Sequence, residues 1–229
     1  MKNHTKARRQ GFTLVELLVV IAIIVALAAL TSPAVIGALN KAERTTTILN
    51  MKEIYKAMFQ FADENDGLFP SEDLAEEYGL SESESSNDLF SQLFAEGTLQ
   101  NGEPLFWVKK SQVCSNIEPD DATTENREFS EDKTLESGDV GFAYISEQFR
   151  TDNSARPLIF DSPPNADGLE FDTELWGKKV LVLRVGGDAK AEKMDKDGNI
   201  VDGDGNNIFT NDAEIWTKNH DIQIKYPEK

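Results

Sequence analysis

One stretch near the start of the chain limits what the protein can fold into. In residues 12–30 the only polar side chains are those of Thr13 and Glu16. About 20 apolar residues in a helix are enough to cross the hydrocarbon core of a bilayer. The stretch therefore predicts a membrane-spanning helix. The Glu16 carboxylate makes that prediction unusual, because a charged group at the centre of such a helix costs about 2.5–3.5 kcal/mol on insertion scales.

The residues before this stretch predict its orientation. Residues 1–11 carry four basic side chains and no acidic one. Because basic flanks stay on the cytoplasmic side of a membrane, we expect this leader in the cytoplasm. The rest of the chain is then expected across the membrane, in the periplasm of a diderm bacterium or outside a monoderm one.

Three kinds of N-terminal segment share this layout: a secretory signal peptide, a plain membrane anchor, and a leader that is cut before the span. An acid just inside the apolar stretch harms the first two kinds. In the third kind, cleavage after Gly11 creates an α-amine on Phe12 with a pKa of about 7.7–8.0. That amine and the Glu16 carboxylate can neutralise one another, within one chain or between neighbours. Glu16 therefore favours the third kind.

The motif GFTLVELLVV, residues 11–20, resembles the N-terminal processing signal of type IV pilins and type II secretion pseudopilins. The resemblance implies that Gly11 is the last leader residue and that a prepilin peptidase produces and methylates an N-terminal Phe12. It implies that Glu16 docks each subunit opposite the N-terminus of its neighbour. Pro33 matches the proline that kinks the helix in this family. A mid-span glycine is replaced by Val25, so no softening of the helix is expected there.

The resemblance also implies a function and a set of partners. The chain would be a structural subunit of a type II secretion pseudopilus, polymerising through its N-terminal helix to help drive protein export. The implied partners are other copies of the chain, minor pseudopilins, the prepilin peptidase, an inner-membrane platform protein and an assembly ATPase. The implied location is the inner membrane, and an extracytoplasmic filament after assembly. Two alternatives remain: a surface type IV pilin used in adhesion, motility or DNA uptake, and a membrane-anchored periplasmic binding module that does not polymerise.

Apolar side chains continue at helical spacing beyond Pro33, at Ile48, Met51, Tyr55, Met58 and Ala62. Steps of three and four residues place them on one helix face. We therefore expect one helix from Phe12 to about Asp63, stopped by the turn-forming sequence in residues 63–70. The expected organisation is a cleaved leader (1–11), a long helix (12–64, with 12–33 in the membrane or the fibre core) and an acidic globular domain (65–229).

The globular part predicts two short helices followed by strands. Ser71 is expected to cap the first helix, and Ser86 or Asn87 the second, ending at Gly97. An extended segment or short strand is expected at 104–110, and a surface loop at 115–139. The expected strands are residues 141–146, 156–162, 178–185, 188–193 after a Gly186-Gly187 turn, 214–218 and 221–226. Together these elements predict an α+β fold, with the long N-terminal helix packed against a small C-terminal antiparallel sheet.

Acidic and amide side chains gather in residues 194–212. Asp195, Asp197, Asp202 and Asp204 lie in a glycine-rich segment, and such oxygen donors suit Ca²⁺. The spacing does not match an EF-hand. The alternative is a pair of Asp-Gly turns. Calcium is thus a possible ligand, and no other cofactor is expected.

Composition argues against two other classes of function. The formal charge of −18 repels phosphate backbones, so we expect no nucleic-acid binding by the folded part. The chain has two histidines, one of them in the leader, and no glycine-rich phosphate loop, so we expect no enzyme. The chain has a single cysteine, Cys114, so it cannot form an intramolecular disulfide. The lack of a disulfide favours the secretion subunit over the surface pilin. We expect Cys114 to be a structural thiol.

Overall fold

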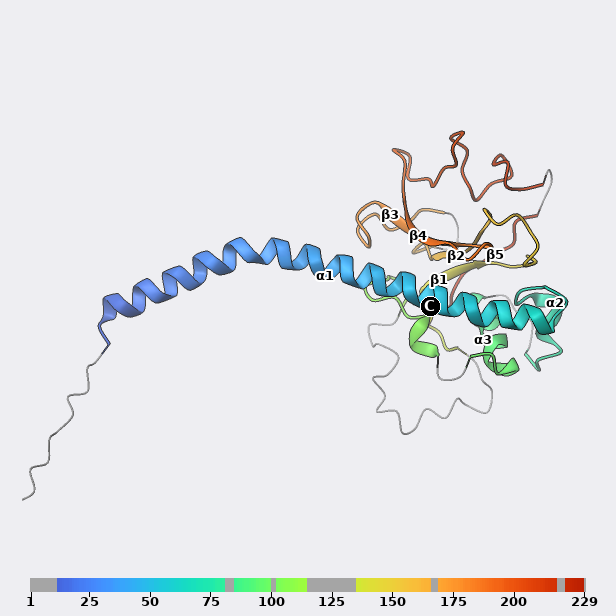
Figure 1. Ribbon diagram of the computed structural model, residues 1–229, viewed down its shortest axis with the longest axis horizontal. Coiled ribbons are helices and arrows are strands. Elements are labelled where there is room, and N and C mark those ends of the chain that lie inside the picture. Colours follow the sequence, from blue (N-terminus) through green and yellow to red (C-terminus); the bar gives the residue numbers. More distant parts are fainter. Residues whose placement is uncertain are drawn as a thin grey trace, which may run out of the picture. The chain divides into compact units, whose positions relative to one another are not determined.

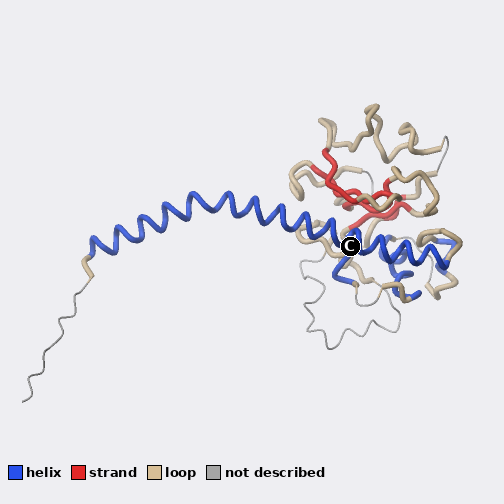
Figure 2. Tube along the Cα trace, viewed as in Figure 1, coloured by secondary structure: helices blue, strands red, loops and turns tan. Residues whose placement is uncertain are grey.

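The computed structural model describes residues 12–80, 85–99, 102–114, 135–165, 169–217 and 221–228. For residues 26–34 it describes the backbone but not the side chains. The chain divides into two units, Met1–Ala42 and the compact unit Glu43–Lys229. Figure 1 shows their elements, and Figure 2 separates helices from strands by colour. The first long helix, α1 (Leu14–Glu64), contributes to both units.

The second part of α1 supplies the core of the compact unit. Met51, Met58 and Ala62 are fully buried, as the helical spacing predicted, and Ile54 and Phe61 are buried beside them. The helix continues across Pro33 and ends where the sequence predicted. There the Gly67 N–H donates to the Ala62 carbonyl over 2.8 Å, with Gly67 at a φ of 87° that favours glycine.

Three short helical elements follow: α2 (Glu72–Ala75), α3 (Ser86–Glu96) and the 3₁₀ turn η1 (Glu103–Leu105). The N-cap of α3 is Ser85, one residue before the predicted candidates. Ser85 and Asp88 form a reciprocal capping box, and this pairing decides the start. Gly97 ends α3 in the left-handed conformation, as predicted. No strand forms in residues 104–110, because η1 and turns take up this segment.

The strands are β1 (Phe142–Ile145), β2 (Pro157–Asp161), β3 (Lys179–Arg184), β4 (Ala189–Lys193) and β5 (Ile224–Lys225). They form one antiparallel sheet in the order β4-β3-β2-β1-β5. Gly186 and Gly187 lie in the turn between β3 and β4, as predicted, but the turn also includes Val185, because the Arg184 N–H donates to the Asp188 carbonyl over 3.0 Å. The strand predicted at 214–218 is absent from its described part, 214–217, which forms turns. Only two residues of the strand predicted at 221–226 pair with the sheet. The α+β prediction is confirmed.

Each face of the sheet carries its own apolar cluster. Side chains alternate along a strand: Phe142 and Tyr144 pack with α1 and α3. Ala143 and Ile145 pack on the opposite face with residues from the segment 200–216. In Figure 1 that segment lies on the side of the sheet away from α3. The core is therefore three-layered, with the last layer built from loops.

The prediction of a single-pass inner-membrane anchor is wrong for the part of the chain that the structure describes. None of its helices combines the length and the apolar character that a bilayer crossing requires. Residues 26–33 of the predicted span lie outside the described side chains.

Candidate functional site

The start of α1 holds the residues that the sequence singled out. Gly11 lies outside the described residues. Phe12 is 77% exposed, and the helix begins two residues later at Leu14. The backbone that follows the predicted cleavage point is therefore outside the helix.

Glu16 makes its contacts within its own chain, to Thr13. The Thr13 backbone N–H and hydroxyl both donate to Glu16 Oε2 over 2.8 Å, and the Glu16 N–H donates to the Thr13 hydroxyl over 3.2 Å. This is a capping box, in which two backbone donors at the helix start are satisfied reciprocally. The hydrogen bonds from Thr13 lower the pKa of Glu16. This role was not predicted above, although the Thr-x-x-Glu pattern of residues 13–16 signals it.

The helix surface behind this cap is apolar and uncovered. Every large apolar side chain described in residues 14–25 is at least 44% exposed. These side chains are Leu14, Val15, Leu17, Leu18, Val19, Val20, Ile21, Ile23, Ile24 and Val25. Exposed apolar patches of this kind mark interaction surfaces. Val35, Ile36 and Leu39 extend the exposed apolar character beyond the undescribed side chains.

The structure resolves the acidic segment into two similar turns. Asp195 Oδ1 accepts hydrogen bonds from the N–H groups of Asp197 and Asn199, both over 2.9 Å. Asp202 Oδ1 accepts from Asp204 and Asn206 in the same way, over 3.0 and 2.9 Å. These are the Asp-Gly turns that the sequence offered as the alternative to calcium.

The two turns also lie next to one another, but they do not assemble a cluster of carboxylates. The Asn207 amide donates to Asn199 Oδ1 over 3.1 Å, and a β-bridge joins Val201 to Asn207. Among the described residues, no three or more His, Cys, Asp or Glu side chains are grouped closely enough to hold a metal ion. Calcium binding by Asp195, Asp197, Asp202 and Asp204 stays a prediction.

Cys114 lies in the compact unit beside Gly141. Burial raises the pKa of its thiol to about 11. The sulfur accepts a hydrogen bond from the Val108 N–H over 3.3 Å. The thiol is therefore protonated at neutral pH, which suits the structural role expected from the sequence.

Comparison with known proteins bears on the same N-terminal segment. Residues 6–32 match the model of the prokaryotic N-terminal methylation motif. No curated protein and no solved structure matches the chain. The matched residues include the predicted cleavage point, the Thr13–Glu16 cap and the first exposed turns of α1. A prepilin-type motif implies processing by prepilin peptidase and assembly into a filament, and it supports a type IV pilin-like protein of structural kind.

Proposed function

We propose that the chain is a filament subunit that is cut between Gly11 and Phe12, methylated at Phe12 and packed through α1. The observation that carries this proposal is the methylation motif at residues 6–32, placed on a helix whose described apolar side chains in residues 14–25 are exposed. The leader is then residues 1–11. The mature chain then begins at Phe12, two residues before α1 starts at Leu14, and the globular domain follows at residue 65.

Burial of the α1 surface supplies the driving force for packing. Fully burying one Val, Leu or Ile side chain contributes about 1.5–3 kcal/mol. Several such side chains per subunit outweigh the cost of association, estimated at about 4–15 kcal/mol. Neighbouring copies of the same helix offer a matching apolar surface, which makes self-assembly the simplest way to cover it.

Glu16 has a second role in this proposal. Its Oε2 atom is engaged by Thr13, and a carboxylate has acceptor sites left on its other oxygen. Cleavage after Gly11 gives Phe12 an α-amine, and we propose that this amine on one subunit pairs with Glu16 of the next. Pro33 would kink the helix between its two parts.

Within this class, we favour the pseudopilus of a type II secretion system. The lone Cys114 supports it, because the C-terminal region is held without a disulfide. The partners would be minor pseudopilins, a platform protein and an assembly ATPase. The second candidate is a surface type IV pilin, which shares the same motif. A deletion strain separates the two: loss of protein secretion favours the first, and loss of a surface fibre in electron micrographs favours the second.

Mass spectrometry of the native protein tests the processing step. We expect a mature chain that begins at Phe12 and carries a methyl group on its α-amine. Gly11→Val should remain uncut, whereas Gln10→Ala, one residue earlier in the leader, should be cut normally. A mature chain beginning near Ser32 would show ordinary signal-peptide removal and overturn the proposal.

A further inference from the structure

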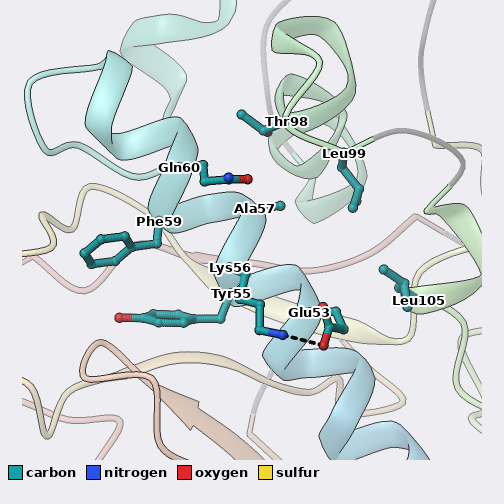
Figure 3. Close-up of a pocket in the computed structure, with 9 residues that line it drawn as sticks. All are labelled: Glu53, Tyr55, Lys56, Ala57, Phe59, Gln60, Thr98, Leu99 and Leu105. Carbon is teal, nitrogen blue, oxygen red and sulfur yellow. Dashed lines mark hydrogen bonds and ion pairs between the residues drawn. The ribbon is translucent and has the colours of Figure 1, made fainter.

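A groove of about 710 Å³ lies beside α1 within the compact unit Glu43–Lys229. One wall is α1, and the other is the segment that follows α3. Figure 3 shows Ala57 of α1 pointing toward Leu99, with Leu105 further along the opposite wall. These three side chains form an apolar floor, in which Leu99 and Leu105 are partly exposed and Ala57, 3% exposed, is buried. Leu99 and Leu105 are partly buried against the core, so the core holds the floor in place.

Tyr55 and Phe59 also line the groove, but their rings do not cover the apolar floor. In Figure 3 the rings of Tyr55 and Phe59 point to the other side of α1. The Tyr55 hydroxyl donates to the Val185 carbonyl over 2.8 Å, which fixes that direction. On the groove side, Lys56 and Glu53 pair with each other over 2.6 Å and cancel their charges.

One end of the groove is acidic. A second hollow, of about 460 Å³, shares Gln60 and Thr98 with the first and is also lined by Asp63, Glu64 and Glu96. Arg150 pairs with Asp63. The remaining carboxylates leave this end negative. The Gln60 amide, which can donate and accept hydrogen bonds, stands where the apolar and acidic parts meet.

The dimensions of the groove fit an extended polypeptide. From Glu53 to Glu64 the wall formed by α1 is about 16 Å long, at 1.5 Å per residue. Five residues of extended chain cover the same distance, at about 3.3 Å each. Carboxylates at one end exclude a nucleic acid and select a positive group.

We propose that this groove binds a segment of a partner protein in which apolar residues are followed or preceded by Lys or Arg. The apolar side chains lie on Ala57, Leu99 and Leu105, and the basic side chains reach Glu64 and Glu96. Every residue of the groove belongs to the compact unit, whereas the exposed apolar side chains that support the proposed filament packing lie in residues 14–25.

Fluorescence anisotropy on the fragment 43–229 tests the proposal. Both apolar clusters lie wholly within this fragment, and a cooperative thermal melt checks that it is folded. The probes are two fluorescein-labelled pools of nine-residue peptides, with Leu or Phe at one end and Lys or Arg at the other, in both orders. A third pool carries Asp or Glu in place of the basic residues. We expect at least one basic pool to bind, the acidic pool not to bind, and added salt to weaken binding.

Two pairs of variants locate the binding. Gln60→Trp fills the groove and Glu64→Lys reverses its charged end, and we expect each to weaken binding at least tenfold. Lys52→Trp, also on α1, and Glu76→Lys, beyond α2, lie outside the groove and should change binding less than twofold. Failure of both basic pools to bind, equal binding of the acidic pool, or wild-type binding by both groove variants would each overturn the proposal.

Discussion

The guanidinium carbon of Arg156 lies 5.0 Å from the ring centre of Trp216. Arg156 Nε also donates to the Ile215 carbonyl over 2.8 Å, and its side chain pairs with Asp152 over 3.1 Å. The Trp216 indole N–H donates in turn to the Ile208 carbonyl over 2.8 Å. These contacts hold the segment before β5 against the sheet. All of these contacts are non-covalent, and the single cysteine of the chain, Cys114, is free.

Removing this arginine is expected to loosen the C-terminal region. Arg156→Met keeps most of the apolar stem but leaves Asp152 and the Ile215 carbonyl without their partner. We expect a loss of about 2–4 kcal/mol in the free energy of unfolding, because Arg156 is buried and paired. Urea unfolding measures this change. Arg44→Met, on α1, is the control and should cost less than about 0.5 kcal/mol.

The two roles of Glu16 can be separated by substitution. Glu16→Gln keeps an acceptor oxygen for the Thr13 N–H, so the capping box survives while the charge is lost. Glu16→Ala removes both. If pairing with the Phe12 amine drives docking, both variants should fail to form filaments in electron micrographs. Filaments of normal yield from Glu16→Gln would show that the cap alone is what assembly needs.

Thr13 offers the complementary test. Thr13→Val removes the hydroxyl that accepts from the Glu16 N–H and leaves the carboxylate in place. We expect faster amide hydrogen exchange in the first turn of α1, because one capping bond is lost. Thr13→Ser retains the hydroxyl and should exchange like the wild type. Equal exchange in both variants would contradict a capping role for Thr13.

Asp161 is expected to make stability depend on pH. It is buried in β2, where its Oδ2 accepts from the Leu181 N–H over 2.6 Å, and burial raises its pKa from 3.8 to about 7. Between these values the folded state holds a proton that the unfolded state has released. The contribution of Asp161 to stability therefore falls as pH rises from about 4 to about 7, and it is level above that range.

Asp161→Asn isolates this effect from that of the other acidic groups. The amide oxygen of Asn still accepts the Leu181 N–H but does not titrate. Between pH 4 and pH 7 the free energy of unfolding of the wild type should fall relative to that of Asp161→Asn, so the variant becomes more stable by comparison as the pH rises. A difference that stays constant across this range would show that Asp161 keeps the same protonation state in the folded and unfolded chain.

Gly187 is expected to tolerate no side chain. A Cβ at this position would lie 2.7 Å from the Tyr55 ring, and the φ of Gly187 is 80°. Gly198 has a similar φ of 86° with nothing within 4 Å, so Gly198→Ala measures the backbone strain alone, about 1 kcal/mol. Gly187→Ala should cost more than that in a thermal melt. Equal costs would mean that Tyr55 moves aside freely.

The calcium prediction can be separated from the role of the turns. Asp195→Asn and Asp202→Asn keep the oxygens that accept the turn hydrogen bonds but remove two charges. If calcium binds, the wild type should release or absorb heat on titration with Ca²⁺ and melt at a higher temperature, and the double variant should lose both responses. Absence of heat and of a melting shift in the wild type would remove calcium from this segment.

The apolar cluster on the face of the sheet away from α3 was not predicted from the sequence. Ile200, Ile208, Phe209 and Trp216 cover one face of the sheet from a segment without regular structure. Such a segment has no periodicity that reveals which side chains turn inward. The strand expected at 214–218 is absent from its described part, residues 214–217, because the backbone there forms turns: the Trp216 N–H donates to the Ala213 carbonyl over 3.1 Å.

Residues near one another in sequence determined the long helix, its stop at Gly67, the central strands and the N-terminal processing motif. Each depends on spacing or on a turn residue within a few positions. Only the tertiary structure decided the register of the sheet, the clamp of Arg156 on Trp216, the raised pKa of Asp161 and the groove between α1 and Leu99. Each of these joins residues far apart in the chain, and their energies depend on burial and distance, which local sequence does not encode.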